Sequence, residues 1–136
     1  MKLSRLLLSL GVPLPSFADA DQEVNHITCH SAQVDNGSLF VAIAGYNSDG
    51  HLFIHDAIAA GACAVVGEKP MSETEVPCIR VPNARLALAL LASELYGHPS
   101  QNHRMIGITG TNGKTTTSHL LRHVIERAGE SCSLFG

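Results

Sequence analysis

The chain has 136 residues, of which 45% are apolar and 15% charged, and nine basic against twelve acidic residues give a net charge of −3. This length is enough for one ordinary domain, and twelve glycines and six prolines are too few for a collagen-like or low-complexity chain. The mildly acidic balance argues against a protein that neutralises a nucleic-acid backbone. We therefore expect no nucleic-acid partner, and any bound phosphate should be held locally.

The first predicted element is an amphipathic helix at the N-terminus. Leu3, Leu6, Leu7 and Leu10 recur at i, i+3, i+4 and i+7, which places them in one apolar stripe. Met1–Ala20 also has the composition of a secretory signal, but two prolines interrupt its apolar run early. We therefore predict a packed helix in a cytoplasmic chain, and no membrane partner, because no other stretch is apolar enough to cross a bilayer.

Alternating strands and helices are predicted after a proline-containing loop at 11–21. Apolar runs bounded by turn residues indicate strands at His26–Thr28, Ser38–Ala44, Ala64–Val66 and Cys78–Val81. Helices are predicted at Leu52–Ala60, which stops at Gly61, and at Ala84–Tyr96, for which Asn83 is a suitable N-cap. This alternation predicts an α/β fold.

A domain boundary is predicted at 97–103, where a helix has ended and a short polar segment with a proline follows. We expect an N-terminal domain at 1–100 and the truncated start of a second domain at 104–136. Three elements are predicted in the second: a strand at Met105–Thr109, a helix at Thr115–Ala128 and a strand at Ser131–Phe135. These would begin a further parallel sheet.

The cysteines and histidines give little support to a metal site. No C-x-x-C pair occurs among the four cysteines, which we interpret as reduced, mostly buried thiols. His51 and His55 have helical i, i+4 spacing beside Asp56, but capping or solvated histidines are the favoured interpretation.

The segment Gly107–Thr117 carries the strongest chemical signal, because it is rich in glycine and threonine and lies between a predicted strand and a predicted helix. Glycines allow backbone N–H groups to turn inward, and the helix that follows presents its positive dipole end to an anion. This context predicts a phosphate-binding loop. The predicted nucleotide contacts are Gly110, Thr111, Asn112, Gly113, Lys114, Thr115 and Thr116.

Two residues of this loop have specific predicted roles. Lys114 would reach the β and γ phosphates of a nucleoside triphosphate, and the Thr115 hydroxyl would ligate a Mg²⁺ ion that bridges them. The strict pattern G-x-x-x-x-G-K-[ST] is not met, because Ile108 stands where the first glycine is required. An ordinary turn before a helix is the alternative, but it does not explain Gly-Lys-Thr at the helix start.

The string Thr109–Thr116 resembles the variant phosphate loop of the Mur ligase family, ATP-dependent enzymes that add amino acids to the peptidoglycan precursor. Leu95–Ser100 is similar to the junction between the first and central domains of that family, and the likeness extends upstream over 37–66. This upstream pattern is most similar to the members that add diaminopimelate or lysine to UDP-N-acetylmuramoyl-L-alanyl-D-glutamate (UDP-MurNAc-L-Ala-D-Glu). The resemblance therefore covers nearly the whole chain.

The resemblance implies how such an enzyme would work. ATP with Mg²⁺ would activate a carboxylate as an acyl phosphate that an amine then attacks, and Lys114 would be the catalytic residue that stabilises the transferring phosphoryl group. The full-length ligase is expected to be a monomer, whereas these 136 residues alone should not catalyse ligation. The substrate contacts implied by the resemblance are Cys29, Ser31, Tyr46, Asn47 and Ser48.

Two positions depart from the family pattern: His30 replaces an aspartate and Ala32 replaces an arginine. Loss of the arginine removes a charge that can hold a diphosphate or a carboxylate through paired hydrogen bonds. Either another group supplies the charge, or the precursor binds more weakly, or the substrate has changed. Two alternative functions stay open: a ligase that adds D-alanyl-D-alanine, and a non-catalytic module that binds a nucleotide or a nucleotide sugar.

Overall fold

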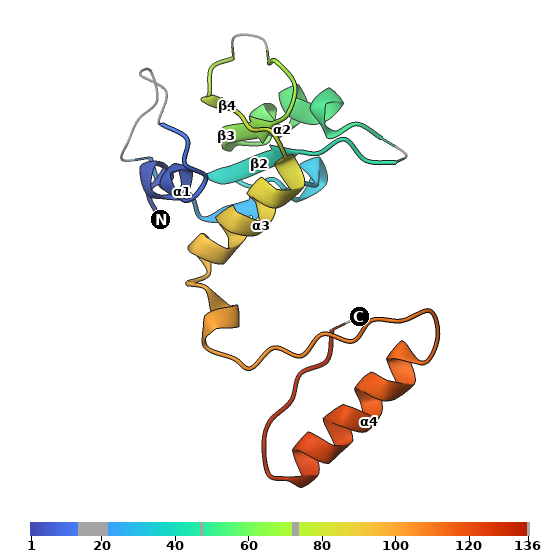
Figure 1. Cartoon of the computed structure of the whole chain (residues 1–136). Coiled ribbons are helices and arrows are strands. Elements are labelled where there is room, and N and C mark those ends of the chain that lie inside the picture. The colour runs from blue at the N-terminus through green and yellow to red at the C-terminus, as the bar shows by residue number, and fades with distance from the viewer. Residues whose placement is uncertain (14–21, 47, 72–73, 136) are drawn as a thin grey trace. The chain divides into compact units, whose positions relative to one another are not determined.

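The computed structural model describes residues 1–13, 22–46, 48–71 and 74–135. The chain divides into two compact units, Met1–Pro99 and Ser100–Gly136, and each is described here by itself (Figure 1). Most of the loop predicted at 11–21 lies outside the described residues.

A four-stranded parallel sheet forms the centre of the first unit (Figure 1). Its strands lie in the order β1-β2-β3-β4, with every neighbouring pair parallel. The strands are β1 (His26–Thr28), β2 (Ser38–Ala42), β3 (Ala62–Gly67) and β4 (Cys78–Arg80). The four predicted strands and the α/β class are thereby confirmed. Because the strands are parallel, their carboxyl ends share one edge, which we call the carboxyl edge of the sheet.

Helices cover both faces of this sheet (Figure 1). Helix α1 (Leu3–Ser9) and helix α3 (Ala84–Leu95) pack on one face, and helix α2 (Ile54–Ala59) packs on the other. Leu39 and Val41 of β2 belong to the apolar cluster that contains α1 and α3, whereas Phe40 belongs to the cluster that contains α2. Because successive strand residues point to opposite faces, a sheet covered on both faces needs an uninterrupted apolar run at β2.

Helix α1 forms from the predicted leucine stripe. The side chains of Leu3, Leu6 and Leu7 are completely buried, and Leu10 packs partly against the same cluster. The amino group of Met1 donates a 2.9 Å hydrogen bond to the Val24 carbonyl oxygen, which ties the chain start to the segment before β1. The packed helix predicted here is confirmed. Neither α1 nor any other helix in the described part of the chain has the length and apolarity needed to cross a membrane.

The helix predicted at Leu52–Ala60 begins differently from the prediction. The structure has a 3-10 turn, η2 (Gly50–Phe53), and only then the α-helix. The turn starts early because the Asp49 carboxylate accepts a 3.0 Å hydrogen bond from the His51 amide. The end is as predicted at Gly61, whose φ of +106° and whose 2.9 Å approach to the Asn36 backbone leave no room for a Cβ atom.

Helix α3 begins at the predicted N-cap. The Asn83 side-chain oxygen accepts a 2.9 Å hydrogen bond from the Leu86 amide, which satisfies one of the unpaired N–H groups of the first turn. On its buried side, Ala84, Ala87 and Leu91 enter the same cluster as α1. Because α3 follows β4 directly, its first residues start at the carboxyl edge of the sheet.

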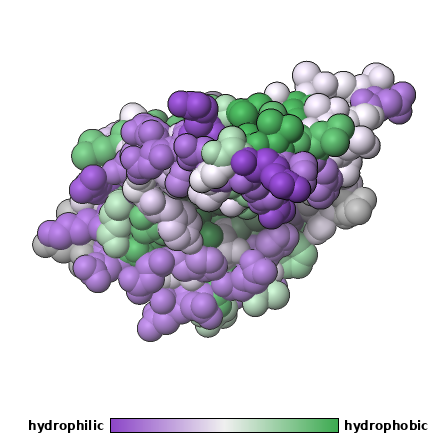
Figure 2. All heavy atoms as spheres, turned by 90° about the horizontal axis from the view of Figure 1, so that it is seen from below, coloured by the Kyte–Doolittle hydropathy of each residue, from purple (hydrophilic) through white to green (hydrophobic). Residues whose placement is uncertain are grey.

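The second unit contains one helix, α4 (Lys114–Arg127), among its described residues. The two strands predicted here are wrong: Met105–Thr109 and Ser131–Phe135 form no strand. A parallel strand exists through hydrogen bonds to its neighbours, and within 100–135 neither segment has such a partner. No described residue of this unit is buried. Large apolar side chains are exposed in this unit, among them Met105, Ile106, Leu120, Val124 and Phe135. Figure 2 shows, on one face of the chain, apolar side chains among polar ones.

The cysteines are less buried than predicted. All four are free thiols, but only Cys63, in the central strand β3, is buried. Burial raises the pKa of the Cys63 thiol. Cys29 follows the end of β1, and Cys78 opens the edge strand β4, so neither is covered on all sides.

Candidate functional site

The predicted substrate residues lie after two neighbouring strands. Cys29 and Ser31 follow β1, and Tyr46 and Ser48 follow β2, so all four come at the carboxyl edge of the sheet. Open parallel sheets bind ligands at this edge. Asn47, the fifth predicted contact, lies outside the described residues.

The turn after β1 is held by its own hydrogen bonds. The Thr28 hydroxyl accepts a 3.1 Å hydrogen bond from the His30 amide, and the 3-10 turn η1 (Ser31–Gln33) follows. The Ser31 hydroxyl makes no hydrogen bond within the described part of the chain and is partly exposed. A ligand at this edge can therefore reach a hydroxyl that the fold does not use.

The segment 43–49, which we call the β2 loop, is closed by short main-chain contacts. The Gly45 amide donates to the Ser48 carbonyl oxygen at 2.9 Å, and the Gly50 amide donates to the Ile43 carbonyl oxygen at 2.8 Å. A Cβ atom on Gly50 would lie 2.7 Å from the Ile43 nitrogen, so only glycine fits there. Within this loop the Tyr46 side chain is fully exposed.

Three side chains tie the β2 loop to the end of β3. The imidazole Nδ1–H of His51 donates to Asp49 Oδ1 at 2.7 Å, and its Nε2 accepts from the amides of Glu68 at 3.1 Å and Lys69 at 3.3 Å. The Lys69 ammonium pairs with the other Asp49 oxygen. The His51 side chain is only 8% exposed, so this cluster is a structural clasp. Sequence reasoning missed it because Lys69 lies far along the chain from Asp49.

The clasp makes the stability of the first unit depend on pH. Hydrogen bonds from Lys69, then from the His51 backbone and side chain, hold the Asp49 pKa far below its ordinary value. The stabilisation is therefore complete above the ordinary aspartate pKa of about 3.9 and is lost as the pH falls toward the lowered value. We expect Asp49→Asn to flatten the decline in urea midpoint between about pH 5 and about pH 2. Equal slopes for the two proteins would contradict this assignment.

Helix α3 is also attached to the carboxyl edge. The Glu68 carboxylate accepts a 2.8 Å hydrogen bond from the Ala84 amide, and Arg80 Nε donates to the Glu68 carbonyl oxygen at 3.0 Å. Arg85 Nη2 donates to the Ala44 carbonyl oxygen at 3.1 Å. The β2 loop is therefore anchored from β3 by the clasp and from α3 by Arg85.

The predicted phosphate loop lies in the second unit, at the start of α4. Gly110 and Gly113 have φ values of +152° and +74°, conformations that favour glycine. The Lys114 ammonium donates a 2.7 Å hydrogen bond to the Gly110 carbonyl oxygen, which folds its charge over the loop. No acidic residue lies in the first turn of α4. The loop therefore combines a cation, a helix N-terminus and glycine backbone, a donor set that suits a phosphate chain.

The other residues of this loop are exposed. Thr111 and Asn112 precede the helix, and Thr115 and Thr116 lie in its first turn, where amide groups have no helical carbonyl partner. The Thr115 hydroxyl is of the type that ligates Mg²⁺ beside a bound triphosphate. Within the described residues, no group of three or more His, Cys, Asp or Glu side chains could hold a metal ion.

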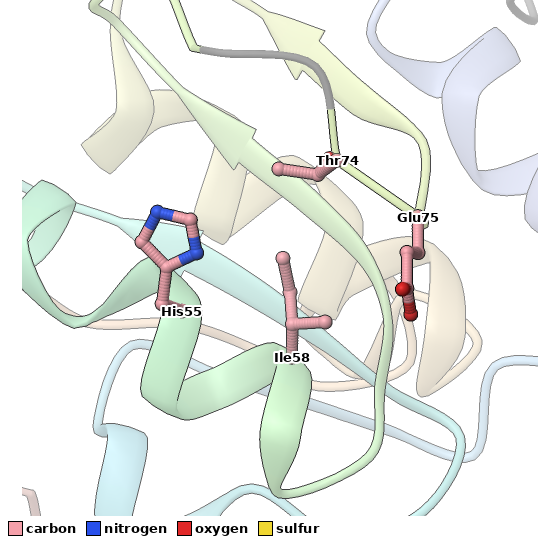
Figure 3. A pocket seen from close by; sticks show the side chains of 4 residues that line it. All are labelled: His55, Ile58, Thr74 and Glu75. Carbon is pink, nitrogen blue, oxygen red and sulfur yellow. The ribbon is translucent and has the colours of Figure 1, made fainter.

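A shallow hollow lies beside α2, away from the predicted contacts. Figure 3 shows His55 and Ile58 of α2 facing Thr74 and Glu75 of the segment before β4. None of the predicted substrate or nucleotide residues lines it. His55 is exposed, as predicted for a solvated histidine, but His51 is neither solvated nor a cap, because its ring is buried in the clasp.

Comparison with protein families gives two matches that follow one another along the chain. Residues 23–96 match the model described as "Mur ligase family, catalytic domain", and residues 108–136 match "Mur ligase middle domain". The first match covers more than half of the chain and contains the whole parallel sheet, and the second contains the phosphate loop.

Individual proteins agree with these matches. The chain is 47% identical over 98% of its length to a UDP-N-acetylmuramyl-tripeptide synthetase of Deinococcus radiodurans. It is 42% identical over its whole length to a UDP-N-acetylmuramoyl-L-alanyl-D-glutamate–2,6-diaminopimelate ligase of Bacillus licheniformis. A crystal structure of MurF ligase from Thermotoga maritima in complex with ADP has a TM-score of 0.58 and 31% identity, covering 78% of this chain and 24% of that one.

This chain spans 28% of the length of each of the two curated relatives. The resemblance inferred from the phosphate loop and the upstream pattern is confirmed by both family matches. The chain belongs to the Mur ligase family.

Proposed function

We propose that this chain is the N-terminal part of an ATP-dependent amide ligase that adds diaminopimelate or lysine to UDP-MurNAc-L-Ala-D-Glu in peptidoglycan precursor synthesis. The observation that carries the proposal is that one chain contains both a four-stranded parallel sheet and a glycine loop to which the Lys114 ammonium is hydrogen-bonded. The relatives at 47% and 42% identity bear the names of enzymes with this reaction. The 136 residues alone are not expected to catalyse it.

The second predicted domain, at 104–136, would bind ATP with Mg²⁺. Lys114 would contact the β and γ phosphates and stabilise charge on the transferring phosphoryl group, and the Thr115 hydroxyl would ligate the metal. Backbone amides would provide the remaining contacts to the phosphates. The ADP complex of the Thermotoga maritima MurF ligase supports a nucleotide in this family. The residues proposed to line the nucleotide are Gly110, Thr111, Asn112, Gly113 and Thr116.

The first predicted domain, at 1–100, would bind the UDP end of the precursor at the carboxyl edge. Ser31 offers a hydroxyl that the fold does not use, and Tyr46 offers an exposed aromatic ring on a loop anchored on two sides. Cys29 and the loop residues 47–48 complete the proposed contacts. Because nucleotide sugars and ATP are cytoplasmic metabolites, we place the enzyme in the cytoplasm, and we propose that the full-length ligase is a monomer.

The second candidate is the ligase that adds D-alanyl-D-alanine, favoured by the 31% identity to the MurF ligase of Thermotoga maritima. The two candidates differ in the precursor that they bind. The first requires UDP-MurNAc-L-Ala-D-Glu, and the second requires the precursor that already carries a third residue. The higher identity to the tripeptide synthetase supports the first.

Calorimetric titration of this chain with the two precursors tests the proposal. Because both precursors carry the same UDP end, we expect this chain to bind both, and the full-length ligase to prefer UDP-MurNAc-L-Ala-D-Glu; in each case the titration measures precursor binding. Ser31→Ala should weaken it about 5- to 10-fold, the effect of about one hydrogen bond. Ser133→Ala, an exposed serine of the second unit, is the matched control and should change nothing. Absence of binding to either precursor would refute a substrate role for the first unit.

A further inference from the structure

The segments proposed to bind the nucleotide sugar contain neither a lysine nor an arginine. Neither 29–33, after β1, nor 43–49, after β2, includes a lysine or an arginine, and the β2 loop adds the negative charge of Asp49. A UDP-sugar carries a diphosphate with two negative charges, which proteins bind best through charge-assisted hydrogen bonds. A lysine or arginine that binds this group would therefore have to come from another element at the carboxyl edge.

Three basic side chains of the first unit follow or end strands at this edge: Lys69, Arg80 and Arg85. The Lys69 ammonium is paired with the Asp49 carboxylate in the clasp. Arg80 and Arg85 donate to main-chain carbonyl oxygens, and neither forms an ion pair within the described residues. Neither positive charge is therefore offset by a carboxylate within the described residues, and both are available to an anionic ligand.

The contacts distinguish the two arginines. Arg80 lies in β4 and its guanidinium contacts Glu68, two strands away from β2 in the sheet order. Arg85 contacts the carbonyl oxygen of Ala44, inside the β2 loop and two residues before Tyr46. Its side chain is exposed, and the contact uses one of the five N–H donors of the guanidinium. Arg85 is therefore the cation that touches the proposed substrate loop.

We propose that Arg85 binds the diphosphate of the nucleotide sugar through its remaining guanidinium donors. This inference rests on the proposed substrate site and names the charged group that completes it. The planar fork of an arginine matches two phosphate oxygens, and the acidic side chains nearby already have donors: Asp49 has Lys69 and His51, and Glu68 has the Ala84 amide. The charge that Ala32 does not supply after β1 thus comes from the start of α3.

Titration of the complete chain with UDP and with uridine tests this role. Arg85→Ala is expected to weaken UDP binding about 10-fold, the effect of losing one charge-assisted contact. Uridine binding should stay unchanged, because uridine lacks the diphosphate. Arg80→Ala is the matched control: it removes the same charge from the same edge but leaves the β2 loop contact, and it should leave UDP affinity within about twofold of the parent.

Comparing UDP with uridine distinguishes direct contact of Arg85 with the diphosphate from a role of Arg85 in holding the β2 loop in place. If Arg85→Ala weakens UDP and uridine equally, Arg85 only braces the β2 loop and the proposal is wrong. The same holds if UDP affinity is unchanged, or if Arg80→Ala has the larger effect. Thermal unfolding of each variant verifies that the titrated protein is folded. If the unaltered chain binds no UDP, the proposed substrate site itself fails, an outcome distinct from a failure of Arg85 alone.

Discussion

Replacing Lys114 with alanine is expected to lower the affinity of the chain for ATP about 10- to 100-fold, measured by titration in the presence of Mg²⁺. In the structure the Lys114 ammonium bonds to the Gly110 carbonyl oxygen, so its charge lies over the glycine loop. A bound triphosphate would exchange this neutral acceptor for charged phosphate oxygens. Hydrogen bonds to charged groups contribute about 1.5–3 kcal/mol, which corresponds to this range of affinity.

The control for this prediction is Arg122→Ala. Arg122 lies on the same helix, two turns beyond the loop, and pairs with Glu126 at 2.7 Å. The substitution Arg122→Ala changes the net charge of the chain by the same amount as Lys114→Ala, but it removes a side chain that does not lie at the glycine loop. If Arg122→Ala lowered ATP affinity as much as Lys114→Ala, the loss would reflect the net charge of the chain. That result would contradict a specific contact between Lys114 and the phosphates.

The fold of the first unit was largely predictable, because the apolar residues that recur at helix or strand spacing in the sequence are the ones that the structure buries. The leucines of α1 bury the stripe that the 3.6-residue spacing indicates, and the run at 38–42 is apolar because the sheet is covered on both faces. Gly61 and Asn83 mark helix ends through local geometry that is visible in the sequence. Each of these features leaves a pattern within a short stretch of the sequence, even where its packing partners lie far along the chain.

The features that the sequence did not predict depend on distant partners. The clasp joins Asp49 to Lys69, and Arg85 contacts Ala44, which lies 41 positions earlier in the chain. The spacing of residues within a short segment cannot predict either contact. The strand predicted at Met105–Thr109 has the right composition, but composition does not supply the neighbouring strand that its hydrogen bonds require. The phosphate loop could be predicted without such a partner, because its glycines and Lys114 lie within one short segment.

Replacing Leu6 with alanine is expected to lower the free energy of unfolding of the first unit by about 2–5 kcal/mol, measured by urea denaturation. Leu6 is completely buried and belongs to the cluster that joins α1, α3 and the sheet. Truncation would remove apolar contact and leave a cavity that the packed helices around it can fill only in part. The effect is large because α1 has only seven residues and is held by this packing rather than by its own hydrogen bonds.

Leu8→Ala is the matched control on the same helix. The Leu8 side chain is 75% exposed, so the same truncation should change the free energy of unfolding by no more than about 0.5 kcal/mol. A similar loss for both variants would mean that burial of the Leu6 side chain does not explain its effect, because alanine is itself a good helix former. It would then contradict the assignment of α1 to the core. A large loss confined to Leu6→Ala is expected, because the sheet that carries the proposed substrate site is covered on this face by α1 and α3.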